Sequence, residues 1–294
     1  MSRSKIIYYH ILASPLYLFM LLPFPVIYLV SDLLYLLMFY VIGYRKKVVY
    51  DNLRNSFPGA GEEWINKVAK GYYRFMVDLF IETFKTLTMS ARQIKKRTVM
   101  ADMSLIKELK ERDQNFLIVM GHYGNWEWCG HSFSLHHQYQ LDALYHPLSN
   151  PFFDWLTNKI RSKFGMGLIP MQSSVREMVK RRGTLSATAF IADQTPQPEN
   201  AYWLTFLNQD TPVFIGTEKI AKKFNYPVVF AKIKREKRGY YSVHFTKITD
   251  DPQNTPDGYI TEQHTRLLEE EIVAAPEFWL WSHRRWNHKR PSNI

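Results

Sequence analysis

The sequence predicts an α/β fold: a mixed sheet flanked by helices, with an N-terminal hydrophobic membrane-anchoring helical segment. First, short apolar runs alternate with amphipathic stretches along most of the 294 residues, which is typical of strands interleaved with helices. Second, hydrophobic residues make up 46% of the chain, enough for a large core and too many for a disordered protein. Third, Asp32 is the only Asp, Glu, Lys or Arg between positions 6 and 44.

The N-terminal segment is long enough to enter a membrane. About 20 apolar residues span the hydrocarbon core of a bilayer, and residues 11–30 contain no Asp, Glu, Lys or Arg. A signal peptide is the alternative, because Arg3 and Lys5 give the chain a positive start. However, the apolar run exceeds that of a usual signal peptide, and no convincing small-residue cleavage site precedes Arg45. We therefore expect residues 1–44 to be retained as a membrane anchor.

The topology of this anchor stays open at the level of sequence. Pro15, Pro23 and Pro25 fall inside the apolar run, and proline breaks regular helix. Cations flank both ends of the segment, so the positive-inside rule assigns no direction. A kinked helix that crosses the bilayer and a re-entrant hairpin with both flanks in the cytoplasm are equally compatible with these residues.

Residues 45–294 are expected to form one α/β domain, because no internal repeat and no second domain is visible. The spacing of apolar residues predicts a long amphipathic helix over residues 62–87. Shorter helices are expected at residues 151–164 and 173–182. Strands are expected at residues 115–120, 141–145, 185–192, 227–233 and 240–246.

The chain is strongly basic, with 38 Lys and Arg against 27 Asp and Glu and a formal net charge of +11. Anionic partners are therefore expected: a membrane surface, an acidic carrier protein or nucleic acid. Nucleic acid is disfavoured, because no recognisable binding module is present and the anchor already accounts for the charge. The single cysteine cannot form an intrachain disulfide or a Cys-rich zinc site. We expect no metal and no cofactor.

The candidate site follows the first predicted strand, in the run Gly121-His122-Tyr123-Gly124-Asn125-Trp126-Glu127. In open α/β sheets, chemistry gathers where a strand ends and the next helix begins. A histidine there can act as a general base near neutral pH, and a carboxylate can fix its tautomer. Amides of Gly124 and Asn125, at the start of the next helix, can face a developing oxyanion. We therefore expect His122 and Glu127 to be catalytic.

The spacing between these two residues is not specific by itself, because it recurs at His137–Asp142 and His264–Glu269. Only the first pair has an apolar strand before it, glycines around it and a helix start after it. Cys129 is the other candidate nucleophile, but nothing in the sequence indicates a lowered thiol pKa. We therefore expect Cys129 to be a buried small residue.

The run from Gly121 to Glu127 resembles the lysophospholipid acyltransferase superfamily, specifically the late acyltransferases of bacterial lipid A biosynthesis (the lauroyl and myristoyl transferases). Further stretches agree with that family in order and spacing over nearly the whole chain, at residues 52–58, 145–148, 150–161, 164–165, 192–194, 276–281 and 283–286. One departure is His146, where members of the family often have arginine.

The resemblance implies transfer of an acyl chain from a thioester, usually of acyl carrier protein and alternatively of coenzyme A, to a hydroxyl of a lipid. It implies that His122 deprotonates this hydroxyl and that Glu127 orients the histidine. Arg161 is the position that matches the family's basic residue at the substrate site. Asp193 and Gln194 match an Asp-Gln pair that shapes the site or contacts the acceptor. The departure at His146 leaves the anionic contact to the acceptor open.

The expected protein is thus an O-acyltransferase of the inner membrane whose active site faces the cytoplasm, with a lipid A precursor as the first choice of acceptor. A phospholipid or aminolipid acceptor would use the same chemistry, and water in place of the lipid would give a thioesterase. A non-catalytic lipid-binding protein is the alternative from another class. It would explain the anchor and the charge, but not the histidine between a strand and a helix.

Overall fold

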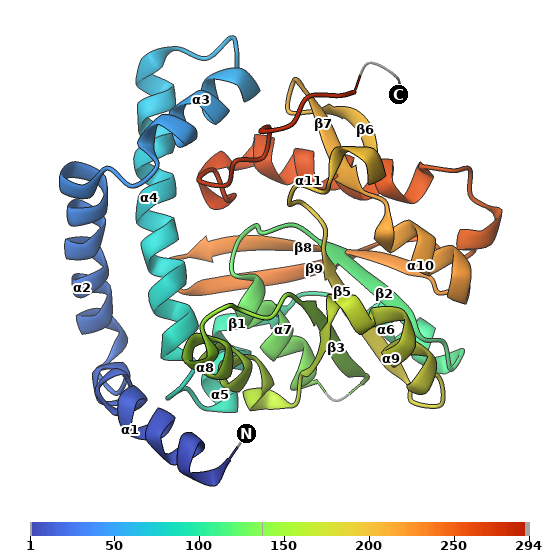
Figure 1. Cartoon of the computed structure of the whole chain (residues 1–294), viewed down its shortest axis with the longest axis horizontal. Coiled ribbons are helices and arrows are strands. Elements are labelled where there is room, and N and C mark those ends of the chain that lie inside the picture. Colours follow the sequence, from blue (N-terminus) through green and yellow to red (C-terminus); the bar gives the residue numbers. More distant parts are fainter. Residues whose placement is uncertain (1, 137, 292–294) are drawn as a thin grey trace.

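The computed structural model describes residues 2–136 and 138–291, and it confirms the predicted mixed α/β fold. Seven strands form one sheet in the order β1-β9-β8-β2-β5-β3-β4 (Figure 1). Their bounds are β1 Thr98–Met100, β2 Phe116–Met120, β3 Gln140–Tyr145, β4 Gly167–Pro170, β5 Ser186–Ile191, β8 Val228–Lys237 and β9 Tyr240–Thr249. Neighbours pair in parallel except β8 and β9, which form an antiparallel hairpin.

All five predicted strands are present, but the sequence did not reveal β1, β4 or a separate hairpin. This hairpin consists of β6 (Ala201–Phe206) and β7 (Gln209–Phe214), which pair only with each other. β1 and β4 are three and four residues long, too short for an alternating pattern to stand out. The two edge strands of the large sheet, β1 and β4, were thus not predicted, and the five strands between them were: β9, β8, β2, β5 and β3.

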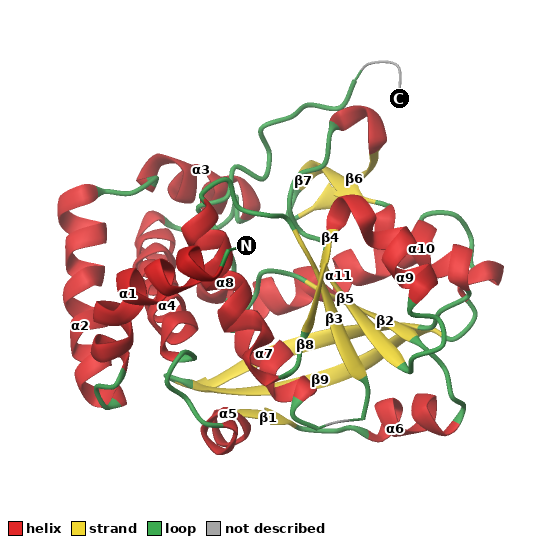
Figure 2. Ribbon diagram, turned by 60° about the horizontal axis from the view of Figure 1, so that its bottom comes forward, coloured by secondary structure: helices red, strands yellow, loops and turns green. Residues whose placement is uncertain are grey.

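Helices cover both faces of the sheet (Figure 2). α7 (Trp126–Ser134) packs on one face, where its side chains join an apolar cluster with Ile118 and Ala187. α10 (Gly216–Phe224) and α11 (Tyr259–Ala274) pack on the other face. The remaining helices of the body are α3 Lys46–Ser56, α4 Glu62–Lys85, α5 Ala91–Arg97, α6 Ser104–Glu111, α8 Pro151–Arg161 and α9 Ser174–Lys180. The expected helices at 62–87, 151–164 and 173–182 correspond to α4, α8 and α9.

The N-terminal segment forms two helices: α2 lies on the outer side of α4, away from the sheet, and α1 runs below it toward α8 (Figure 1). α1 spans Arg3–Met20 and α2 spans Phe24–Leu36, followed by a π-helical turn at Leu37–Ile42. The expectation of a break at each proline was wrong for Pro15, which lies inside α1. Pro23 and Pro25 do mark a break, because they stand at the cap and in the first turn of α2, where proline needs no backbone hydrogen-bond partner.

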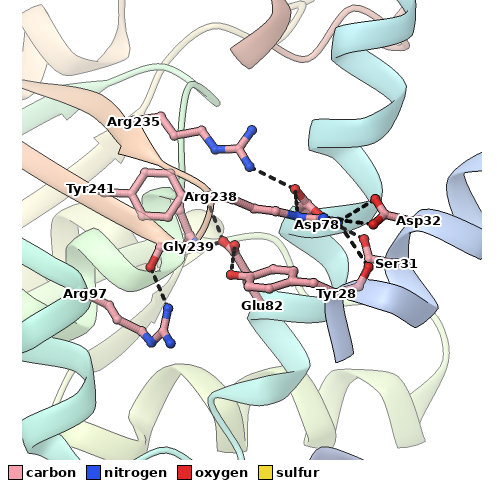
Figure 3. A network of polar contacts seen from close by, with 11 residues as sticks. Tyr28, Ser31, Asp32, Asp78, Glu82, Arg97, Arg235, Arg238, Gly239 and Tyr241 are labelled. Carbon is pink, nitrogen blue, oxygen red and sulfur yellow. Dashed lines mark hydrogen bonds and ion pairs between the residues drawn. The ribbon is translucent and has the colours of Figure 1, made fainter. Parts of the chain in front are cut away.

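A buried polar network attaches α2 to the body (Figure 3). Asp78 of α4 is fully buried and accepts hydrogen bonds from Ser31 of α2 and from Arg235 and Arg238 of the β8–β9 hairpin. Arg238 also forms an ion pair with Asp32 of α2, 2.9 Å away. A buried charge that loses one partner is strongly destabilising, so this network makes α2 part of the folded unit.

The second half of the network centres on Glu82, one turn further along α4. Its carboxylate accepts hydrogen bonds from Tyr28 of α2, Asn125 of the loop before α7, and Tyr241 of β9. Burial raises the pKa of Glu82, with the negative charge of Asp78 adding to the effect. The same network that attaches the N-terminal helices therefore also fixes the start of α7, next to the candidate site.

Candidate active site

His122 lies at the carboxyl end of β2, and its imidazole is hydrogen-bonded to Asp193. Nδ1 of His122 is 2.6 Å from Oδ1 of Asp193, and the backbone N–H of His122 donates to Oδ2 of the same carboxylate at 2.7 Å. The indole N–H of Trp279 donates to Oδ2 at 2.9 Å. A single carboxylate thus holds both the backbone and the ring of the histidine.

This geometry fixes the tautomer of His122. Burial alone would raise the pKa of the Asp193 carboxyl, but the charge and hydrogen bonds of His122 and the bond from Trp279 outweigh it and lower this pKa to about 2. Asp193 is therefore a carboxylate at neutral pH and can only accept hydrogen bonds. The Nδ1 atom must carry the proton, which leaves Nε2 as the basic nitrogen.

The sheet brings these two residues together although 71 positions separate them in the sequence. β2 and β5 are adjacent parallel strands with Met120 opposite Ile191, so the segments that follow them leave the same edge. Gly121 allows the side chains of Leu268 and Asp193 to lie close to the backbone. A Cβ atom at this position would lie 2.6 Å from a methyl carbon of Leu268 and 3.1 Å from Oδ2 of Asp193.

The prediction that Glu127 orients His122 differs from the structure. The buried Glu127 carboxylate binds the Arg161 guanidinium through two nitrogens, at 3.1 Å from Nε and 2.6 Å from Nη2. Burial would raise the pKa of Glu127, but the charge and hydrogen bonds of Arg161 outweigh it and lower this pKa. Glu127 therefore holds Arg161 beside the histidine, and the orienting carboxylate is Asp193.

The expectation that the backbone amides of Gly124 and Asn125 face an oxyanion differs from the structure at Gly124 and stays a prediction at Asn125. The N–H of Gly124 donates to the carbonyl of Phe278 at 3.0 Å, so it is already used within the protein. Asn125 caps α7: its side-chain oxygen accepts from the N–H of Trp128, and its amide nitrogen donates to Glu82. Both residues are buried, and they shape the turn rather than line the cavity.

A cavity of about 670 Å³ opens at this histidine. His122, Glu127, Arg161 and Gln194 contribute polar groups to its lining, so the structure brings four of the predicted site residues to one cavity. The rest of the lining is mostly apolar and comes from α7, from the central strands and from α10. A polar end with a base and a cation, continuing into an apolar cavity, suits a reactive group attached to a hydrocarbon chain.

Cys129 also lines this cavity, but its thiol is not activated. Burial raises the pKa of Cys129 to about 12, so the thiol is protonated at neutral pH, whereas a nucleophilic cysteine needs a thiolate. This agrees with its expected identity as a buried small residue.

From the sequence, no role at the site was assigned to three residues that surround Asp193. Trp279 donates to the carboxylate, while Arg285 and His264 are buried close to it. Burial lowers the pKa of Arg285 to about 10 and that of His264 to about 4, and in both cases the charge of Asp193 opposes the shift. Of the repeated spacings, His264–Glu269 is thus no second site, because Glu269 accepts from the N–H of Leu207 instead. His137 lies outside the described residues.

Comparison with known proteins points to a family whose activity fits this cavity. The model of the family described as bacterial lipid A biosynthesis acyltransferase matches residues 2–288. The chain is 23% identical to the lipid A biosynthesis lauroyltransferase of Escherichia coli (strain K12), over 95% of this chain and 90% of that protein. It is 23% identical to a lipid A biosynthesis acyltransferase of Haemophilus influenzae, over 78% of this chain and 72% of that protein.

A third relative is the lipid A biosynthesis palmitoleoyltransferase of Escherichia coli (strain K12), which is 21% identical over 92% of this chain and 88% of that protein. The names of these relatives differ in the acyl group, whereas the family match extends over nearly the whole chain. The chain belongs to the family of bacterial lipid A biosynthesis acyltransferases and is an acyltransferase.

Proposed function

We propose that this acyltransferase moves a fatty acyl chain from the thioester of acyl carrier protein to a hydroxyl of a lipid A precursor. The observation that carries the proposal is the His122–Asp193 pair at the polar end of a largely apolar cavity. The names of the relatives support the lipid A precursor as acceptor. The net charge of +11 supports an acidic carrier as donor.

In the proposed mechanism, Nε2 of His122 removes the proton from the acceptor hydroxyl. The alkoxide oxygen attacks the thioester carbonyl, and a C–O bond forms as the carbonyl becomes a tetrahedral oxyanion. The C–S bond then breaks, and the imidazolium of His122 returns its proton to the leaving thiolate. Asp193 stabilises the imidazolium between these two steps. No covalent acyl-enzyme is required.

Arg161 supplies the positive charge beside this reaction. Nε and Nη2 of Arg161 are occupied by Glu127, while among the described residues Nη1 has no hydrogen-bond partner. We assign Arg161 to the substrate, through the developing oxyanion or an anionic group of the lipid. Glu127 keeps the guanidinium in place. Gln194, which lines the same cavity, is assigned to contact with the acceptor.

Replacing Asp193 by asparagine is expected to lower activity strongly, whereas the same replacement at the surface residue Asp51 is not. Asp193→Asn removes the acceptor that fixes the ring, so kcat should fall by roughly 10³- to 10⁴-fold, as expected for an imidazole in the wrong tautomer. Asp51→Asn, on the exposed surface of α3, is the matched control and should leave kcat unchanged. The measurement is the rate of acyl transfer to a lipid A precursor in detergent. An Asp193→Asn enzyme within tenfold of wild type would refute the assignment.

The identity of the acceptor is tested by mass spectrometry of lipids from cells that express the wild type or His122→Ala at equal levels. We expect a lipid A precursor heavier by one acyl group only in cells with the wild type, because the variant lacks the base. A heavier phospholipid or aminolipid would replace the acceptor but keep the mechanism. Free fatty acid released by the wild type, without any heavier lipid, would indicate a thioesterase.

We propose further that the protein binds one leaflet of the inner membrane from the cytoplasmic side. In the described part of the chain, Phe24–Ile42 is the stretch long and apolar enough to cross a bilayer. However, on the inner face of α2 Ser31 donates to Asp78 of α4 and Asp32 pairs with Arg238 of the β8–β9 hairpin, while Arg74 of α4 lies 5.0 Å from the ring of Tyr35. A crossing would carry these charges into hydrocarbon, which is costly.

The outer faces of α1 and α2 suit a bilayer surface instead. They carry exposed apolar side chains: Ile7, Ile11, Leu12 and Leu18 on α1, and Val26, Leu29, Leu33 and Leu36 on α2. Arg3 and Lys5 before them, and Lys46 and Lys47 after them, can bind anionic headgroups. Between α1, α2 and α4 an apolar groove of about 580 Å³ continues this surface into the body.

Flotation with vesicles that contain anionic phospholipid tests this attachment. The double variant Leu29→Asp, Leu33→Asp should remain in the soluble fraction, because two charges then interrupt an apolar face that is about 60% exposed at both positions. Val273→Asp, at a position 58% exposed on α11, is the matched control and should float like the wild type. Equal flotation of all three proteins would contradict attachment through α2.

A further inference from the structure

One part of the large cavity is a slot between α7 and the sheet, which we call the α7 slot. Its helical wall consists of Trp126, Cys129, Gly130 and Phe133. These positions are spaced i, i+3, i+4 and i+7, so they share one face of the helix. Because an α-helix rises 1.5 Å per residue, this wall extends roughly 10 Å from the level of the catalytic histidine.

The opposite wall of the α7 slot is the sheet, whose parallel strands are in register. Ile118 of β2 lies opposite Ala189 of β5, and Ala189 lies opposite Ala143 of β3. All three side chains line the cavity and belong to the apolar cluster on the α7 face. One row nearer the histidine are Met120 and Ile191. The middle of the slot therefore has two alanines side by side.

These alanines explain why the slot is open. A helix packed on a sheet normally fills the gap with large side chains, but here the strands contribute Ala143 and Ala189 to the cavity lining and the helix contributes Gly130. Ala143 and Ala189 are partly exposed although they lie in inner strands of the sheet. Met166 bounds the slot beside the helix, where a Cβ atom on Gly130 would lie 3.1 Å from its sulfur.

The slot ends two rows below the histidine. Phe133 of α7 and Phe245 of β9 line this end, with ring centroids 5.9 Å apart. In the next row of strand residues, Phe116 and Ala187 are fully buried and outside the cavity lining, while Leu141, which lies opposite Ala187, borders the cavity at this end. Four residues of strand separate this closed row from Met120, which corresponds to roughly 13 Å. The slot thus has a fixed depth, and the alanine pair lies halfway along it.

We propose that Ala189 and Ala143 determine the length of the acyl chain that the enzyme transfers. This inference rests on the proposed function, in which the thioester carbonyl lies at His122. The hydrocarbon chain of the donor then extends along the α7 slot, over the two alanines, toward Phe133. A larger side chain at either alanine shortens the slot, whereas a smaller one at Phe133 lengthens it. Both changes leave the His122–Asp193 pair intact.

The test is a competition among donors. Purified enzyme receives a lipid A precursor and an equimolar mixture of acyl carrier protein thioesters from decanoyl to palmitoyl, and mass spectrometry gives the distribution of products. For Ala189→Val we expect the ratio of shorter to longer products to rise about tenfold or more over wild type, because each methylene that no longer fits costs at least that factor. Phe133→Leu should shift the ratio toward longer chains.

Ala187→Val is the matched control, because it makes the same substitution on the same strand and face but outside the cavity lining. Its distribution should equal that of wild type. Ile220→Phe fills the part of the cavity on the opposite face of the sheet and should also leave the distribution unchanged. An unchanged distribution in both Ala189→Val and Phe133→Leu would overturn the proposal, as would a shift caused by Ile220→Phe.

A binding measurement separates this proposal from the proposed reaction. The thermal stability of His122→Ala protein is measured with each thioester, since a bound ligand raises the unfolding temperature without turnover. We expect the chain length that stabilises most to become shorter when Ala189→Val is added. If no enzyme transfers an acyl chain but this shift is present, the reaction is wrong and the slot assignment holds. If wild type transfers chains and this shift is absent, the slot assignment is wrong.

Discussion

The buried carboxylate of Asp193 is the group on which the arrangement of the site depends. It accepts hydrogen bonds from the backbone and ring of His122 and from the indole of Trp279. The His122 bonds connect the ends of β2 and β5, while the indole adds the C-terminal segment. An unpaired buried charge is costly, so folding favours the His122 tautomer that donates to the carboxylate. This is also the tautomer that the proposed proton removal requires.

The second constraint is the small size of two neighbouring side chains on the face of the sheet that α7 covers. Ala143 and Ala189 lie side by side in register, and Gly130 of the helix lines the same cavity. Small residues at these three positions leave room where large side chains normally fill the space between a helix and a sheet. The Asp78 and Glu82 network keeps α4, α2 and the start of α7 in fixed relation to it. His122, the cavity and α2 thus belong to one packed unit.

The sequence was informative where the signal is local. The helix over residues 62–87 and the strand before His122 follow from apolar spacing, and the agreement of several motifs in order led to the family. Pairing across the sheet was not visible: the expected partner of His122 was Glu127, five residues away, and the actual one is 71 residues away. Asp193 directly follows a predicted strand, so the convergence of strand ends could have indicated it. The bond from Gly124 to the carbonyl of Phe278 has no sequence signal.

The central claim is that Asp193, and not Glu127, sets the tautomer of His122. Nitrogen-15 NMR of histidine-labelled enzyme measures this directly, with the His122 resonances assigned by comparison with His122→Ala. In the wild type and in Glu127→Gln, Nδ1 of His122 should carry the proton and Nε2 should be unprotonated at a pH where the imidazole is neutral. Asp193→Asn should lose this preference. If Glu127→Gln changed the tautomer and Asp193→Asn left it unaltered, the account would be contradicted.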